Sequence, residues 1–403
     1  MSAHRPGPVG IRRLLAAACA VAGVVPLASA PAAAIPVAPA APVAGPRADC
    51  PTRGLDPALV ARLDRAVRQT MRQASIPGAV VGLWLPGRGQ YVRAFGVADK
   101  RTGAPMRVDI NSRIGSVTKT FTVTALLELV DQGRVHLDDP IGSYLHGVPD
   151  GDRITLRDLA DMRSGLFPYS ADPGFIKALY SHPTRGFTPG QLLGYAFRHP
   201  NLFAAGTQYL YSNTNTVLIG LVVEKITGTP LAEYLRRHVT GPSHLPHSYL
   251  AHGTHLPQPY AHGYTEQTLS GSEADATHWN PSWAWADGAM VSDLGDLRTW
   301  AGDLFRGNLL SRRTQAQRLD FVPTGIPGVG YGLGVFDVNG WIGHNGVVPG
   351  YETLMVHLPA QRATLVVLVN TDIDDNGNEL STLLGQAVTS VATPQNIFRL
   401  PAA

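Results

Sequence analysis

Strand-like segments lie near both ends of the sequence, and a long stretch with mostly helical periodicity separates them. The strand-like runs, bounded by Gly, Pro and other turn residues, are residues 78–85, 89–99, 330–338, 341–346, 352–358 and 363–370. Strands that are far apart in sequence and share one sheet leave the segment between them as an insertion. We therefore predict an α/β fold in which a helical lobe interrupts a sheet-containing lobe, with an active site in the crevice between them.

The predicted folded unit extends over residues 55–393. Apolar residues at helical spacing over 55–74 predict an N-terminal helix behind Asp56, a plausible cap, and a last helix is expected over about 378–391. The sheet-containing lobe would comprise 55–115 and 285–393, and the helical lobe 116–284.

The first residues have the layout of a secretory signal peptide. A basic start with Arg5, Arg12 and Arg13 precedes an apolar run over 14–27, and small residues with A-x-A spacing follow. This order of regions is typical of an exported protein, and the apolar run is too short for a membrane anchor. We therefore expect residues 1–34 to be removed during export and the mature protein to be secreted, with no membrane span.

The basic charge of the chain belongs largely to this segment. The formal net charge is +3, and residues 1–34 hold three arginines and no acid, so the remainder has a net charge of zero. Such a chain offers no general basic surface to nucleic acid or an anionic membrane. Cys50 is the only cysteine beyond residue 34, which excludes an internal disulfide from the mature protein. Residues 35–54, rich in Pro and Ala, are predicted to form a linker.

The stretch IGSVTKTF, Ile114 to Phe121, contains one of only four lysines in a chain that otherwise uses arginine as its cation. Arginine stays protonated in proteins, whereas burial can neutralise a lysine. Ser116 and Lys119 are one helical turn apart, so both side chains lie on one face of the helix that Ser116 is expected to cap. A capping serine followed by a surface lysine is about equally consistent with these residues alone.

Two further motifs carry polar side chains suited to catalysis. Tyr211 and Asn213 lie in YSN, where a phenol near a lysine can have a lowered pKa and carry protons, and an amide can bind substrate. His344 and Gly346 lie in HNG, where a glycine lets substrate approach the backbone and the next N–H donate to it. Taken singly, a polar loop and a structural histidine explain these motifs better.

Two other clusters are weaker candidates. Trp279, Trp283 and Trp285 lie close together in THWNPSWAWADG, where aromatic rings either wall a pocket or pack in the core. Five histidines occur between residues 244 and 262, but Pro and Gly interrupt every turn, so solvated loop histidines are expected rather than zinc ligands. The sequence has no H-E-x-x-H, no G-x-S-x-G and no phosphate-binding glycine loop. We expect no metal and no organic cofactor.

The three motifs follow the order S-x-x-K, Y-x-N and H-x-G, and in this the chain resembles the penicillin-recognising serine hydrolases. The resemblance is strongest to the D-alanyl-D-alanine carboxypeptidases and class C β-lactamases and extends from about residue 55 to 391. It implies a β-lactamase/transpeptidase-like fold, in which N- and C-terminal helices flank an antiparallel sheet and a helical lobe is inserted. Supporting stretches are RIGSVTKTFT, LDDPIGSYLHG, ITLRDLADMRSGL, YLYSNTNTVLIGLVVEKITG, GYGLGV and GHNGVVPGY.

The resemblance implies a role for each matching residue. Ser116 would be the acylated nucleophile, and Lys119 would accept its proton. Tyr211 would relay protons to the leaving group and later activate water. Asn213 would orient the acyl side chain, and the backbone N–H groups of Ser116 and Val347 would form the oxyanion hole.

Some positions depart from the family pattern. His344 stands where many relatives have the lysine of K-T-G, so we expect a weaker, pH-dependent cation there. Asn345, before Gly346, replaces a usual threonine, and Phe336 replaces an arginine found in some relatives. No Lys or Arg occurs from residue 319 to 361. We therefore expect a free substrate carboxylate to be recognised poorly.

The sequence thus predicts an exported serine acyl hydrolase that forms an acyl-enzyme on Ser116. The expected substrate is the D-Ala-D-Ala end of peptidoglycan stem peptides, with β-lactams as acylating inhibitors. Alternatives are an esterase, an amidase for D-amino-acid or lipid-like substrates, a β-lactamase, or a β-lactam-binding sensor without turnover. Trp283 matches a family position near the site and is expected to wall the acyl pocket. We expect a monomer that acts on a small peptide or ester.

Overall fold

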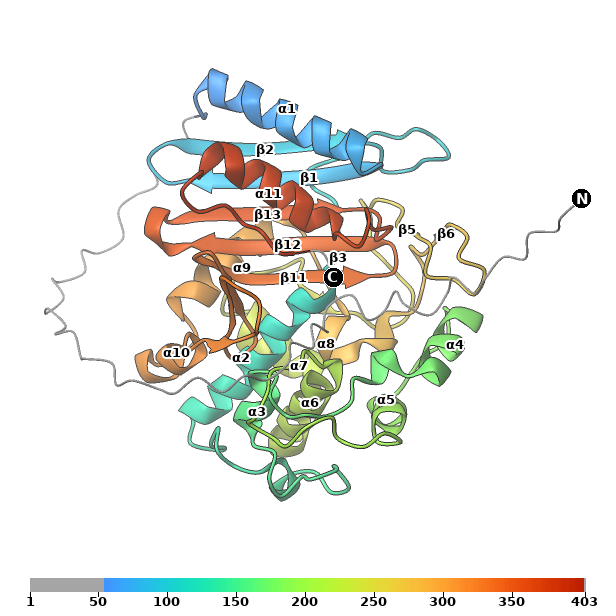
Figure 1. Ribbon diagram of the computed structural model, residues 1–403, viewed down its shortest axis with the longest axis vertical. Coiled ribbons are helices and arrows are strands. Elements are labelled where there is room, and N and C mark those ends of the chain that lie inside the picture. Colours follow the sequence, from blue (N-terminus) through green and yellow to red (C-terminus); the bar gives the residue numbers. More distant parts are fainter. Residues whose placement is uncertain (1–53, 402–403) are drawn as a thin grey trace, which may run out of the picture.

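An antiparallel sheet of eight strands forms the centre of the computed structural model, which describes residues 54–401 (Figure 1). The strand order is β2-β1-β13-β12-β11-β10-β9-β8, so strands from both ends of the described chain share one sheet, as the sequence predicts. The strands are β1 (Gly78–Leu85), β2 (Gly89–Gly96), β8 (Val322–Pro323), β9 (Val329–Tyr331), β10 (Phe336–Val338), β11 (Trp341–Val348), β12 (Tyr351–Leu358) and β13 (Ala363–Val369).

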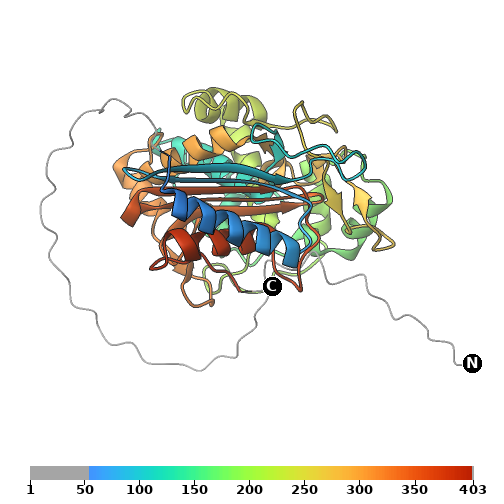
Figure 2. The same cartoon turned by 90° about the horizontal axis from the view of Figure 1, so that it is seen from above.

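Helices α1 (Pro57–Gln73) and α11 (Leu380–Ala392) pack together over one face of the sheet (Figures 1 and 2). The buried side chains of α1 recur every four residues and form one apolar stripe. The Asp56 carboxylate caps this helix by accepting from the Ala58 N–H. The predicted N- and C-terminal helices are therefore confirmed.

Helix α9 (Leu294–Arg306) packs on the opposite face, against β12 and β13 (Figure 2). Every residue of β13 is buried, because helices cover both faces of the sheet at this strand. The remaining α-helices are α2 (Thr118–Asp131), α3 (Leu156–Ala160), α4 (Pro173–Ser181), α5 (Pro189–Ala196), α6 (Asn213–Thr227), α7 (Leu231–Leu235), α8 (Trp285–Gly288) and α10 (Arg312–Arg318). The short strands are β3 (Ser112–Arg113), β4 (Tyr249–Leu250), β5 (Tyr264–Thr265), β6 (Ala274–Asp275) and β7 (Met290–Ser292).

Helix α2 runs through the interior and packs against α6 and α8. Its residues are buried without interruption from Thr118 to Leu127. The threonine hydroxyls are accommodated because they donate to backbone carbonyls, as Thr122 does to Ala286 O at 2.7 Å. A helix that is buried on all sides therefore carries Lys119 into the core.

The structure differs from the sequence prediction at one strand. The run 330–338, expected as a single strand, forms the hairpin of β9 and β10. The Gly332 N–H donates to Val335 O across the turn, and Gly334 has a φ of 71°, which favours glycine. Leu333 and Val335 lie within this turn, so the sequence reads as one continuous apolar strand.

The predicted signal peptide, 1–34, and the linker, 35–54, lie outside the described residues, apart from Gly54. The lobe boundaries at residues 115 and 285 stay predictions. Within residues 54–401, no helix has the length and apolar character needed to cross a membrane.

Candidate active site

Ser116 lies in a single turn of 3-10 helix, Gly115–Val117, that leads into α2. The cap position of α2 is Val117, and no side chain caps the helix, so the predicted capping role of Ser116 was wrong. The Ser116 hydroxyl instead accepts a hydrogen bond from Lys119 Nζ at 2.9 Å. Ser116 is also partly exposed between buried neighbours. Its hydroxyl is therefore available to an incoming substrate.

Lys119 has no exposed surface, which excludes the surface-lysine alternative. Its Nζ also donates to the backbone oxygen of Asp287 at 2.9 Å and lies 3.7 Å from Asp287 Oδ1. Burial lowers the pKa of Lys119 to about 8, although the Asp287 charge opposes this shift. Lys119 can therefore change its protonation state near neutral pH.

Asp287, in α8, is a site residue that the sequence did not identify. It is 2% exposed, and its Oδ2 accepts a hydrogen bond of 2.6 Å from the Tyr169 hydroxyl. Burial raises the pKa of Asp287 to about 6, even though Lys119 favours the charged form. The carboxylate is therefore mostly ionised at neutral pH and supplies a counter-ion to Lys119. The only signal in the sequence is a single acid within the apolar run WAWADGAMV.

Tyr211 precedes α6, and its ring lies 4.9 Å from Lys119 Nζ. Burial raises the pKa of Tyr211 well above its ordinary value; a hydrogen bond with Ser116 opposes the rise, and the Asp287 charge adds to it. The expected lowering of this pKa was wrong, because burial is its largest influence and disfavours the charged phenolate. Tyr211 therefore remains a protonated phenol beside Lys119.

His344, on β11, is 1% exposed, and its Nε2 lies 3.0 Å from the Tyr331 hydroxyl. Burial, and then the charge of Lys119, lower the pKa of His344 to about 3. The expectation of a pH-dependent cation near neutral pH was therefore wrong. The imidazole stays neutral and acts through hydrogen bonds.

Two glycines allow the backbone around Ser116 to approach β11. A Cβ atom on Gly346 would lie 2.2 Å from Ile114 O and 2.7 Å from Ser116 N. A Cβ atom on Gly115, whose φ is 51°, would lie 2.7 Å from Val347 N. No side chain fits at either position, so the backbone nitrogens of Ser116 and Val347 lie in one small region. An oxyanion hole requires two such donors close together.

Asn213, the first residue of α6, has one half of its amide engaged and the other half free. Its Nδ2 donates to Ser170 Oγ at 3.2 Å. Its Oδ1 is buried and has no hydrogen-bond partner among the described residues. A buried acceptor without a partner is costly, and a substrate N–H would satisfy it.

Asn345 and Glu379 form a second polar pair beside the site. Asn345 Nδ2 donates to Glu379 Oε2. Burial raises the pKa of Glu379 to about 7, although the hydrogen bond from Asn345 opposes this shift. Nearby, Phe336 is 5% exposed and its ring lies 5.3 Å from that of His344. A buried aromatic ring thus stands at the position where the resemblance would place an arginine.

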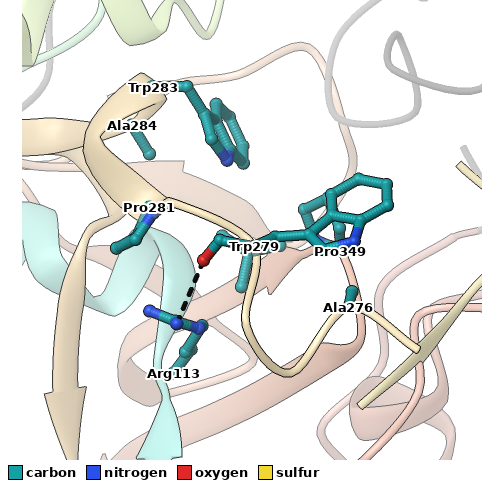
Figure 3. Close-up of a pocket in the computed structure, with 8 residues that line it drawn as sticks. Arg113, Ala276, Trp279, Pro281, Trp283, Ala284 and Pro349 are labelled. Carbon is teal, nitrogen blue, oxygen red and sulfur yellow. Dashed lines mark hydrogen bonds between the residues drawn. The ribbon is translucent and has the colours of Figure 1, made fainter. Parts of the chain in front are cut away.

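Trp283 lies in the 3-10 helix Pro281–Trp283 and is 5% exposed. Its ring lies 6.1 Å from that of Phe175, and its backbone oxygen accepts a hydrogen bond from Tyr169. Figure 3 shows Trp283 in a pocket whose lining does not include Ser116. Core packing accounts for its burial, and its predicted role as a wall of the acyl pocket stays a prediction. The pocket is lined by Arg113, Ala276, Trp279, Pro281, Trp283, Ala284, Val348 and Pro349.

Of the five histidines between residues 244 and 262, only His247 joins a group of three possible metal ligands in the described part of the chain. Its Nδ1 lies 2.6 Å from Asp293 Oδ2, and its backbone N–H donates to Asp296 at 2.8 Å. The Asp293 carboxylate also caps α9. These protein contacts account for the cluster.

The geometry defines a site for covalent acyl transfer. Ser116 supplies a hydroxyl, Lys119 a buried amine 2.9 Å away, and Tyr211 a phenol whose ring lies 4.9 Å from that amine. The backbone nitrogens of Ser116 and Val347 lie in one small region beside the hydroxyl, and their role as an oxyanion hole stays a prediction.

A β-lactamase family model matches residues 63–388, and the chain belongs to this family. A D-stereospecific amidohydrolase from Streptomyces sp. has a solved structure similar to this one, with a TM-score of 0.73 and 31% identity; the match covers 83% of this chain and 98% of that one. The D-amino acid amidase from Ochrobactrum anthropi SV3, solved with L-phenylalanine amide, has a TM-score of 0.73 at 26% identity, over 83% of this chain and 97% of that one.

A D-aminopeptidase from Brucella anthropi is 27% identical over 318 residues, which are 76% of this chain and 59% of the relative. The chain therefore spans about six tenths of that relative's length. Together these matches establish a serine hydrolase of the β-lactamase fold.

Proposed function

We propose that this protein hydrolyses amides and short peptides of D-amino acids through an acyl-enzyme on Ser116. The observation that carries the proposal is the hydrogen bond between Ser116 Oγ and the buried Lys119 Nζ, with Asp287 as counter-ion. The names of the similar structures, a D-stereospecific amidohydrolase and a D-amino acid amidase, support the substrate class. The basic start and apolar run at the N-terminus support action after export.

Acylation begins when Ser116 Oγ attacks the carbonyl carbon of the substrate. As the new C–O bond forms, the hydroxyl proton passes to the neutral amine of Lys119. The carbonyl oxygen becomes an oxyanion, and the N–H groups of Ser116 and Val347 donate to it. Only the neutral fraction of Lys119 can accept the proton, so this step becomes faster as pH rises towards 8.

Collapse of the tetrahedral intermediate breaks the C–N bond and releases an amine. Tyr211 donates a proton to the leaving nitrogen, and Lys119 returns its proton to Tyr211. Water then attacks the ester carbonyl and gives up a proton to the same relay. The C–O bond to Ser116 breaks, a carboxylic acid leaves, and the hydroxyl is restored.

The acyl part of the substrate is oriented by Asn213. Its free Oδ1 accepts an N–H from the amine or amide of the substrate, which satisfies the buried oxygen. A D-amino-acid amide supplies such a donor and releases an uncharged leaving group.

D-alanyl-D-alanine carboxypeptidase activity is the second candidate, and the order of the three motifs favours it. It requires a cation for the terminal carboxylate, and Phe336 supplies none. A β-lactamase or a β-lactam-binding sensor would share the acylation step, and steady turnover after the first acylation distinguishes an enzyme from a sensor.

The test is a panel of D-phenylalanine amide, L-phenylalanine amide and a D-Ala-D-Ala peptide acid, measured as kcat/KM. We expect the D-amide to exceed its L-enantiomer and the peptide acid by about tenfold or more. A preference for the peptide acid would instead favour the carboxypeptidase. Hydrolysis of none of them, with rapid acylation by a penicillin, would indicate a sensor.

A further inference from the structure

Glu379 lies at the edge of the site and has no part in the acyl-transfer steps. It occupies the cap position of α11, where a carboxylate commonly accepts from the helix N–H groups, yet its side chain makes no capping bond. The carboxylate instead accepts from Asn345 Nδ2 on β11. At the start of this helix the Ser381 N–H donates instead to Glu352 Oε2, at 2.7 Å.

Asn345 lies on β11 between His344 and Gly346, and Gly346 is where this strand approaches Ser116. The Asn345 side chain therefore links Glu379 to that strand. One of the two N–H groups on Asn345 Nδ2 is donated to Glu379, which leaves the other for a substrate. A carboxylate that accepts this second N–H would lie close to the Glu379 carboxylate, because both acids would bind the same nitrogen. Like charges at short range are strongly unfavourable in a partly buried site.

The charge of Glu379 influences Tyr211, the residue that relays protons in the proposed mechanism. Burial is the main reason for the raised pKa of Tyr211, and the negative charge of Glu379 contributes to the same rise. Tyr211 is the group that protonates the leaving nitrogen. The hydrogen bond to Asn345 and this influence on Tyr211 together link the Glu379 charge to the group that protonates the leaving nitrogen.

We propose that Glu379 determines specificity on the leaving-group side, where its negative charge disfavours leaving groups that carry a carboxylate and favours neutral or cationic ones. The inference rests on the proposed acyl-enzyme at Ser116 and is independent of the preference for D-amino acids. Leaving groups of the favoured class are ammonia, neutral amines and the amines of peptide amides.

The discrimination should depend on pH. Burial raises the pKa of Glu379 to about 7, so the repulsion is full above pH 8 and is lost as pH falls towards 6. The titratable groups around it are Tyr211 and Glu352, with Asp372 beyond Glu352, and Asn345 is the neutral contact. Burial, and then the Glu379 charge, raise the pKa of Glu352 well above its ordinary value.

The test uses two esters with the same acyl group, 4-acetoxybenzoate and 4-acetoxybenzamide, which differ in the charge of the leaving phenol. The quantity measured is the ratio of their kcat/KM values, acid over amide. We expect Glu379→Gln to raise this ratio about tenfold at pH 8, because the like charge is removed. Glu379→Asp keeps the charge and should keep the wild-type ratio. In the wild-type enzyme the ratio should rise as pH falls from 8 to 6, whereas in Glu379→Gln it should stay flat.

A structural role alone would change both rates together and leave the ratio constant. An unchanged ratio in Glu379→Gln overturns the proposal. If that variant does not fold, a wild-type ratio that stays constant from pH 8 to 6 overturns it equally. Hydrolysis of both esters without any hydrolysis of D-amino-acid amides would contradict the substrate class proposed above and leave this test intact.

Discussion

Lys119 and His344 are both buried side chains that can carry a positive charge, and both lie beside Tyr211. Burial lowers the pKa of each, to about 8 for Lys119 and about 3 for His344. Most of this difference comes from the ordinary pKa values, 10.5 for lysine and 6.5 for histidine, and the partners add to it. Asp287 lies 3.7 Å from Lys119 and favours its charge, whereas His344 contacts the Tyr331 hydroxyl and a backbone oxygen. The counter-ion therefore limits how far burial lowers the pKa of Lys119, and His344 has no such partner in the described part of the chain.

The largest effect is expected at the nucleophile, and the effects of changes around Lys119 and His344 are to be compared with it. Ser116→Ala should lower kcat by a factor on the order of 10⁴–10⁶, because no covalent intermediate can form. A penicillin-type reagent should label Ser116 in the wild-type protein, and mass spectrometry of the digested protein locates the adduct. An adduct on another serine would refute the assignment.

The next effect tests whether Lys119 serves as a base or only as a charge. Lys119→Arg keeps a cation but cannot accept a proton, so kcat/KM should fall by a factor on the order of 10²–10⁴. Lys119→Ala should be about as damaging. Acylation at a near wild-type rate in the arginine variant would mean that only the positive charge matters.

Removing the counter-ion should make the surroundings of Lys119 resemble those of His344. Asp287→Asn deletes the charge that holds the pKa of Lys119 up, so the pH at which activity rises should move below about 8. A neutral amine would then be present at lower pH, and kcat/KM relative to its own maximum should increase at pH 6. Tyr169→Phe removes the hydrogen bond to Asp287 but no charge, and its profile should move much less. An unchanged pH profile in Asp287→Asn would show that the Asp287 charge does not influence the pKa of Lys119.

The smallest effect is expected at His344. His344→Asn loses the hydrogen bond to Tyr331 and should lower kcat/KM by about tenfold. Because the imidazole is already neutral, the shape of the pH profile between 5 and 8 should be the same as in the wild type. A wild-type profile with a step near pH 6 that vanishes in His344→Asn would show that the histidine does titrate.

Local features of the site were predictable from the sequence. Ser116 and Lys119 are three residues apart, and helical geometry alone places such side chains on one face. The pairing of 78–85 with 89–99 followed from two apolar runs joined by turn residues. The order of the three motifs in the chain predicted that Tyr211 and the strand with His344 belong to the same site as Ser116.

The contacts that set the electrostatics were not predictable. Asp287 is 168 residues from Lys119, and Glu379 is 34 residues from Asn345, so neither pair leaves a periodic signal. The pKa of Tyr211 depends on how deeply its ring is buried, which no short motif records. Sequence spacing indicated which groups are present, and tertiary packing decides their charge.

The close approach of Gly115 and Gly346 has a consequence for how such an enzyme can change over evolutionary time. The groups that would hold the oxyanion are main-chain nitrogens, so no exchange of one side chain for another deletes them. They are lost only if the strand is pushed away, as a methyl group at residue 346 would do by lying 2.2 Å from Ile114 O. Residues 344 and 345, next to this glycine, can therefore vary and give new substrate preferences while the reaction itself is inherited intact. Laboratory evolution aimed at new substrates would do best to randomise these two positions and leave both glycines untouched.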